Sequence, residues 1–174
     1  MKVSQATSVL ALAAQALSHS SIHRVTADKT TRYPGGGSTG PVLNLSSPAI
    51  AWSILYAPAP GLVAQARAGS NVTFHWSRWL YSHKGPITAW IAPYEGDMAK
   101  VDMKLEFRMF SQEAKGADGN GFWTARLPAD IKLGTYIIRQ ELTCFALNIT
   151  GFGTSSPRGT KFPGAYSSTD AGLF

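Results

Sequence analysis

The sequence predicts an all-β protein, an immunoglobulin-like or fibronectin-like antiparallel β-sandwich with long loops. The 174 residues include 17 glycines, 10 prolines and 5 tryptophans, which is typical of aromatic-rich strands joined by many turns. Apolar and polar residues alternate in short segments that recur roughly every ten residues between glycine and proline turns, the pattern of a sandwich. No segment shows the periodicity of a convincing amphipathic helix.

The overall composition excludes several classes of protein. Hydrophobic residues make up 44% of the chain and charged residues 15%, so a disordered tail protein is excluded and one globular unit is expected. The 16 Lys and Arg exceed the 10 Asp and Glu by six, but they are scattered singly along the sequence. We therefore expect no nucleic-acid partner. A second long apolar run is missing, so we expect no multi-pass membrane protein and no membrane partner.

The first eighteen residues have the pattern of a secretory signal peptide. Lys2 is followed by a short apolar core from Val9 to Leu17, and small residues surround a cut after Ser18. This predicts a secreted, extracellular protein with one domain, 19–174. His19 would then be the N-terminus, and its amine and imidazole could together chelate Cu(II). Cleavage elsewhere, for instance after Ser20, is the alternative and would discard His19.

Three glycosylation sequons and one cysteine also bear on whether the protein is secreted. The sequons at Asn44, Asn71 and Asn148 fit a secreted glycoprotein. Cys144 is the single cysteine, so no intramolecular disulfide can form. Either its thiol is buried and inert, or its partner has been lost.

The expected strands follow the turns in order. Loops are expected over 33–41 and 57–61, which are rich in glycine or proline. In the segment 71–76, Val72, Phe74 and Trp76 share one face, and His75 points outward. Further strands are expected at 87–91, 101–110, 122–127, 135–139 and 145–149, and the strand 101–110 shows the longest alternation.

His83 lies in the loop Ser82-His83-Lys84-Gly85-Pro86, just before an expected strand. This block, with Phe162-Pro163-Gly164-Ala165-Tyr166 near the C-terminus, resembles the fungal copper-dependent lytic polysaccharide monooxygenases of auxiliary activity family nine, formerly glycoside hydrolase family sixty-one. Further similar blocks follow in the family's order from His19 to the C-terminus. They are Ser46-Ser47-Pro48-Ala49-Ile50, Ala68 to Trp76, Gly134 to Glu141 and Asn148 to Gly151.

The resemblance implies a site and an activity. One copper ion would be held by His19, through its amine and a ring nitrogen, and by His83, and both histidines would be the catalytic, cofactor-binding and metal residues. An external electron donor would reduce the copper, and cellulose or another β-glucan would be cleaved oxidatively at C1 or C4. We expect a monomer.

The sequence also departs from the family's pattern. Arg139-Gln140-Glu141-Leu142 runs straight into Thr143-Cys144, so the segment with the family's outer-shell His and Gln and its axial Tyr is missing. This predicts reduced activity and a sandwich with one or more strands missing. The alternatives are a non-catalytic copper- or polysaccharide-binding relative and a truncated gene product. Gln140 stands where the family often has His and is given no copper role, and the family's partner for Cys144 is replaced by Ala51-Trp52.

For several other residues, a functional role is weighed against a structural one. The aromatic residues Trp79, Tyr81 and Tyr166 are candidates for a polysaccharide-binding face, or they pack in the core or loops. The acids Glu95 and Asp97 are interpreted as a solvated turn rather than a catalytic pair. Glu141 is expected to have a structural role.

Overall fold

The protein is described by a computed structural model. The described residues are 22–28, 30–32, 46, 63–76, 87–98, 101, 105–113, 121–140, 143–156, 158–167 and 169. They form strands, turns and loops. No helix long and apolar enough to cross a bilayer occurs among these residues.

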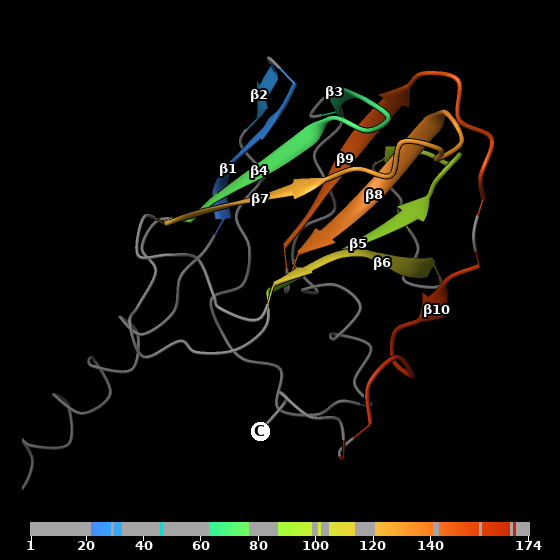
Figure 1. Cartoon of the computed structure of the whole chain (residues 1–174). Helices are drawn as coiled ribbons and strands as arrows, with labels where there is room; N and C mark the ends of the chain where they lie inside the picture. Colours follow the sequence, from blue (N-terminus) through green and yellow to red (C-terminus); the bar gives the residue numbers. More distant parts are fainter. Residues whose placement is uncertain are drawn as a thin grey trace, which may run out of the picture.

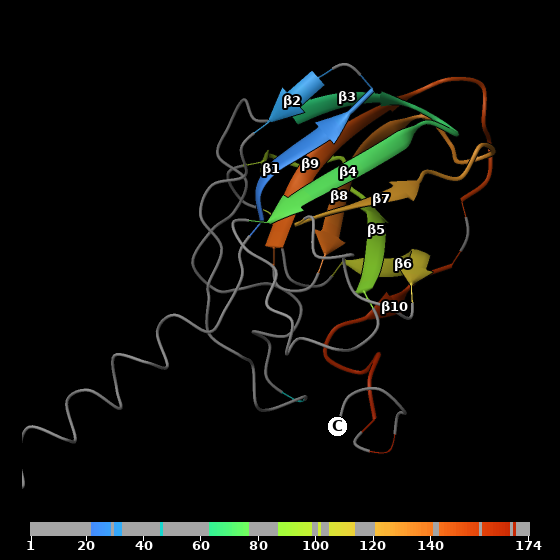
Figure 2. The same cartoon turned by 60° about the vertical axis from the view of Figure 1, so that its left-hand side comes forward.

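The described residues include ten strands in two sheets that pack face to face, which confirms the predicted sandwich (Figures 1 and 2). The four-stranded sheet has the order β2 (Thr30–Arg32), β1 (Ile22–Ala27), β4 (Asn71–Trp76) and β7 (Phe122–Arg126). The six-stranded sheet has the order β10 (Thr160–Lys161), β6 (Glu106–Glu113), β5 (Ile87–Pro93), β8 (Gly134–Gln140), β9 (Thr143–Thr150) and β3 (Val63–Arg67).

Neighbouring strands of the described part pair antiparallel, except that β3 runs parallel to β9 from Val63 beside Ala146 to Arg67 beside Thr150. A parallel neighbour needs a long connection between the strands. Here the connection from β3 to β9 contains β4 to β8, so these two neighbouring strands of the six-stranded sheet are far apart in the sequence.

The main core lies between the sheets and is centred on Phe74. Its ring stacks on Trp123, with centroids 5.6 Å apart, and meets the edge of Phe145 at 5.7 Å. Phe74 is fully buried and Trp76 nearly so, while His75 between them is half-buried on the other face. The inward and outward positions predicted for 71–76 are therefore confirmed.

A second apolar cluster covers the outer face of the six-stranded sheet. It explains why β8 and β9 are buried along most of their length, since strands covered on both faces do not alternate. Tyr166 and Phe162 from the C-terminal segment close this cluster over Trp90. Its buried members are Trp90, Ala92, Phe107, Ile137, Cys144, Ala146 and Phe162.

The strand expected at 101–110 differs most from the structure. Its described part begins as β6 at Glu106, and its partner register on β5 shifts between Ala89 and Trp90. Phe110 is the extra residue between Met109, which pairs with Trp90, and Ser111, which pairs with Ala89, so the alternation is interrupted there. Phe110 packs against the main core, and Met109 is 39% exposed.

Candidate functional site

The two sheets share a common end, called here the Trp76 end. Trp76 at the end of β4 pairs with Ile22 at the start of β1. In the other sheet, Gln140 at the end of β8 pairs with Ala89 near the start of β5. The turn from β3 to β4, where the Ser70 N–H donates to the Arg67 carbonyl, lies at the opposite end. β1 and β5 therefore both begin at the Trp76 end (Figure 1).

The predicted copper ligands His19 and His83 lie outside the described residues. In the sequence, His19 precedes the start of β1 at Ile22 by three positions, and His83 precedes the start of β5 at Ile87 by four. Both strands begin at the Trp76 end, in different sheets. The topology therefore brings the strands that follow these histidines to one end of the sandwich, and the ligand assignment itself stays a prediction.

A buried amide without a partner lies at this end. Gln140 is 0% exposed, and neither Nε2 nor Oε1 of its side chain makes a hydrogen bond within the described part of the chain. It follows Ile138 on the face of β8 that points into the main core. A buried amide that gives up water without a replacement partner costs about 1 to 3 kcal/mol of free energy. The last position of β8 is thus polar where packing alone favours an apolar side chain.

We expect Gln140→Met to raise the unfolding free energy of the copper-free protein by about 1 to 2 kcal/mol, because it removes the orphaned amide and nearly keeps the volume. Urea denaturation measures the change. Gln112→Met, at an exposed position of β6, is the matched control and should alter stability by less than about 0.5 kcal/mol. A Gln140→Met variant less stable than the parent would contradict the expectation and show that the amide is bonded in solution.

Beside Gln140, Arg139 faces the second apolar cluster. It is 3% exposed, and its guanidinium lies over the Phe162 ring at 4.3 Å from the centroid. Such a cation–π contact is strongest when water is excluded. Tyr166, a candidate surface aromatic, is half-buried here, with ring centroids 5.3 Å from Phe162 and 6.1 Å from Trp90. It packs within the cluster rather than standing on an open face.

Cys144 is buried and free, as one of its two interpretations predicted. Burial raises the pKa of its thiol from 9.0 to about 12, and Arg139 opposes that rise. A thiol held neutral in this way is inert toward oxidants and metals at neutral pH.

The raised pKa of Cys144 makes stability depend on alkaline pH. The fold favours the protonated thiol, so this contribution is complete below pH 9 and is lost as pH rises from 9 toward 12. The unfolding free energy of the parent should fall relative to Cys144→Ala by up to about 1.4 kcal/mol per pH unit in that window. Urea denaturation of both proteins at several pH values measures the difference. Parallel pH profiles would contradict the prediction.

The remaining candidates are placed as follows. Glu95 and Asp97 are exposed in the turn after β5, where the Tyr94 hydroxyl donates to the Asp97 carbonyl at 2.7 Å, as a solvated turn requires. Asn71 is exposed, and the Asn148 amide donates to Gln65 Oε1 at 2.8 Å. Candidates outside the described residues are Asn44, Trp79, Tyr81 and Glu141.

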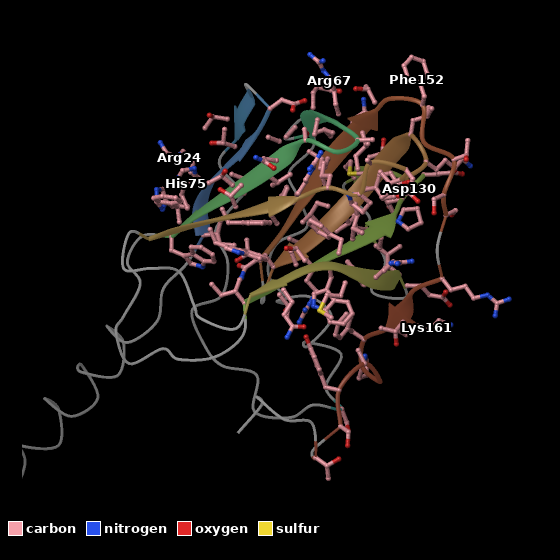
Figure 3. The ribbon with its side chains drawn as sticks, in the orientation of Figure 1. Arg24, Arg67, His75, Asp130, Phe152 and Lys161 are labelled. Carbon is pink, nitrogen blue, oxygen red and sulfur yellow. The ribbon has the colours of Figure 1, made fainter. Side chains whose placement is uncertain are left out.

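A depression of about 510 Å³ lies at the opposite end of the sandwich. Arg67, Asp130 and Phe152 line it, and all three are labelled in Figure 3. Within the described part of the chain, no three His, Cys, Asp or Glu side chains gather as metal ligands.

Sequence reasoning missed a group of polar side chains on the outer face of the four-stranded sheet. Arg24 Nη2 donates to His75 Nδ1 at 3.0 Å, and His75 Nε2 lies 3.3 Å from Thr26 Oγ1. Burial, then Arg24 and His23, lower the pKa of His75. The alternation in 71–76 indicated that His75 points outward, but β1 was not predicted, so its partner could not be found.

Solved polysaccharide monooxygenases have the same fold. The crystal structure of HiLPMO9B superposes with a TM-score of 0.76 at 25% identity, over 88% of this chain and 89% of that chain. A cellulose-active polysaccharide monooxygenase from M. thermophila gives 0.73 at 20% identity, over 87% and 88%. The protein therefore has the β-sandwich fold of the polysaccharide monooxygenases.

The chain belongs to Auxiliary Activity family 9, formerly GH61, whose sequence profile matches residues 13–174. The family resemblance found in the sequence is thus confirmed. AA9 family lytic polysaccharide monooxygenase B of Geotrichum candidum is 32% identical over 79% of this chain and 46% of its own length. Monooxygenases C and A of the same fungus are 34% and 33% identical, and the match covers 31% and 57% of their lengths. The chain thus spans about a third to just over half of these relatives.

Proposed function

We propose that this protein is a secreted copper-dependent lytic polysaccharide monooxygenase that cleaves cellulose or a related β-1,4-glucan at C1 or C4. One copper ion would be held by His19, through its amine and a ring nitrogen, and by a ring nitrogen of His83. The observation that carries the proposal is the family match across 13–174, since the chain retains His19 and the block Ser82-His83-Lys84-Gly85-Pro86.

The residues present fit a copper ion. Amine and imidazole nitrogens in a planar set are ligands that Cu(II) prefers. The strands that follow both histidines begin at the Trp76 end, where the Gln140 amide is buried without a hydrogen-bond partner. Buried polar groups normally have a hydrogen-bond partner, so a buried amide without one supports a bound polar or charged species at this end.

The protein's own contribution is binding and orientation. His19 and His83 would fix the ion at the end of a rigid sandwich, at the surface, where a polysaccharide chain can reach it. The bound copper supplies one-electron redox chemistry, with electrons from an external donor. Leader removal after Ser18 is a condition for binding, because an extra residue before His19 would convert the chelating amine into an amide.

One observation favours a second candidate, a relative that binds copper or polysaccharide with little or no turnover. Gln140 on β8 pairs with Thr143 on β9, so Glu141 and Leu142 alone connect the two strands. This tight connection stands where the resembled family carries its outer-shell His and Gln and its axial Tyr. Loss of outer-shell partners typically reduces the activity of a metal site by 10- to 100-fold.

The experiment is to secrete the full chain from a fungal host, verify by mass spectrometry that it begins at His19, and load it with Cu(II). Electron paramagnetic resonance with nitrogen hyperfine structure, together with oxidised oligosaccharides from cellulose and a reductant, is the expected result. Protein with one glycine added before His19 is the control and should lose both. Copper without oxidised products would favour the second candidate, and no stoichiometric copper would refute the first.

A further inference from the structure

The outer face of the four-stranded sheet carries an ordered array of side chains. Thr31, Thr26, Thr73 and Thr124 stand opposite one another on β2, β1, β4 and β7 and form one straight row across the sheet. The Thr73 and Thr124 hydroxyls lie 2.8 Å apart, and those of Thr26 and Thr31 lie 3.4 Å apart. Neighbouring strands are about 4.8 Å apart, so the row presents hydroxyl groups at a regular spacing.

A second row runs parallel to the first, two residues nearer the Trp76 end. It consists of Arg24, His75 and Phe122, since His75 pairs with Arg24 on one side and with Phe122 on the other. The Phe122 side chain is 46% exposed, and its ring centroid lies 6.2 Å from that of His75. Figure 3 shows Arg24 and His75 together on this side, pointing away from the sandwich.

The described outward positions of this face carry charge of one sign. Arg24 and Arg126 are cations on its outward positions, and exposed His23 lies close enough to act on His75. The described outward positions of β1, β4 and β7 include no Asp or Glu. Asp28, in the turn after β1, directs its carboxylate to the backbone N–H of Arg67 instead, at 2.8 Å.

Arg24 still has donors to offer to a ligand. His75 occupies Nη2, and Nε is buried, so the N–H groups of Nη1 are the donors that Arg24 can offer to a ligand. A guanidinium presents five N–H donors in a planar fork that matches a carboxylate. His75 accepts from Arg24 and so holds the fork in place, which reduces the entropy lost when an anion binds.

We propose that this face binds a polysaccharide that carries uronic-acid carboxylates. Arg24 would bind a carboxylate, the threonine row would exchange hydrogen bonds with sugar hydroxyls, and the Phe122 ring would cover the apolar C–H face of a sugar. The surface covers the outer face of the four-stranded sheet, with the row of Arg24, His75 and Phe122 nearest the Trp76 end. The proposed contacts need no metal, so binding can be tested without copper.

The test is calorimetric binding of polygalacturonate to the EDTA-treated full chain at low salt, about 20 mM, where charge interactions are weakly screened. We expect binding that Arg24→Gln weakens about tenfold, the loss of one charge-assisted contact. Phe122→Ala, at a half-exposed ring that the fold does not need, should weaken it about fivefold. Arg108→Gln, at an exposed position on β6 of the other sheet, is the matched control and should bind within about twofold of the parent.

Ligand controls separate a sugar site from a general attraction between charges. Fully methyl-esterified polygalacturonate keeps the sugars but loses the carboxylates and should bind at least about tenfold more weakly. The proposal is overturned if polygalacturonate does not bind, or if Arg108→Gln weakens binding as much as Arg24→Gln does. It is equally overturned if polyacrylate or single-stranded DNA binds as tightly as polygalacturonate. Should Arg24→Gln fail to fold, as judged by its thermal melt, Phe122→Ala decides the outcome.

Discussion

Replacing His83 with alanine is expected to weaken Cu(II) binding to the mature chain by more than about 100-fold, because even outer-shell partners of a metal site contribute 10- to 100-fold. The change removes one of three proposed nitrogen ligands and leaves the amine and ring of His19. Isothermal titration calorimetry measures the affinity, and electron paramagnetic resonance reports the change in the nitrogen set.

The matched control is His75→Gln. Both ring nitrogens of His75 have partners in the four-stranded sheet, Arg24 and Thr26, so copper affinity should stay within about twofold of the parent. Should His83→Ala bind copper as the parent does, the assignment of His83 would be wrong, and loss of copper in His75→Gln would show that His75 takes part in binding.

Phe74→Ala has the largest expected effect on stability. The Phe74 side chain is 0% exposed, and the rings of Trp123 and Phe145 pack against it. Its truncation should lower the unfolding free energy by about 3 to 5 kcal/mol, through lost transfer energy and an unfilled cavity. For a domain of this size the melting temperature should fall by roughly 10 °C.

Phe152→Ala is the control for the same chemical change at the surface. Phe152 is 101% exposed, so its removal should change the unfolding free energy by less than about 0.5 kcal/mol. Differential scanning calorimetry of the three proteins makes the comparison. Similar melting temperatures for Phe74→Ala and the parent would show that the two sheets do not pack around this ring.

The strands with strong apolar patterns could be predicted from sequence. The segment 71–76 alternates because only one of its faces meets the core, and β4 follows that prediction residue by residue. β1 and β3 escaped prediction because they are short and contain alanine or charged residues, as in Ile22–Ala27 and Val63–Arg67. Their strand state comes from long-range partners on β4 and β9, which local propensity does not report.

In the candidate sites, too, local motifs could be predicted from sequence and long-range neighbours could not. His83 and the surrounding block were evident as a motif, because a motif is local. The proximity of Arg24, His75 and Phe122 was not, since the three residues lie on strands that meet only when the sheet forms. Basic residues scattered singly along a sequence can therefore gather on one face, and their separation in the sequence says little about their separation in space.

The parallel pairing of β3 with β9 has a consequence for synthesis on the ribosome. Gln65 meets Asn148, 83 residues later, so β3 has no neighbour in its sheet until the last long strand has emerged. At about 5 to 20 residues per second, β3 waits roughly 4 to 17 s for β9. Closing so long a loop also carries an entropic cost that slows the search. The edge of the six-stranded sheet formed by β3 is therefore completed late, and until then the backbone groups of β3 lack their partner strand.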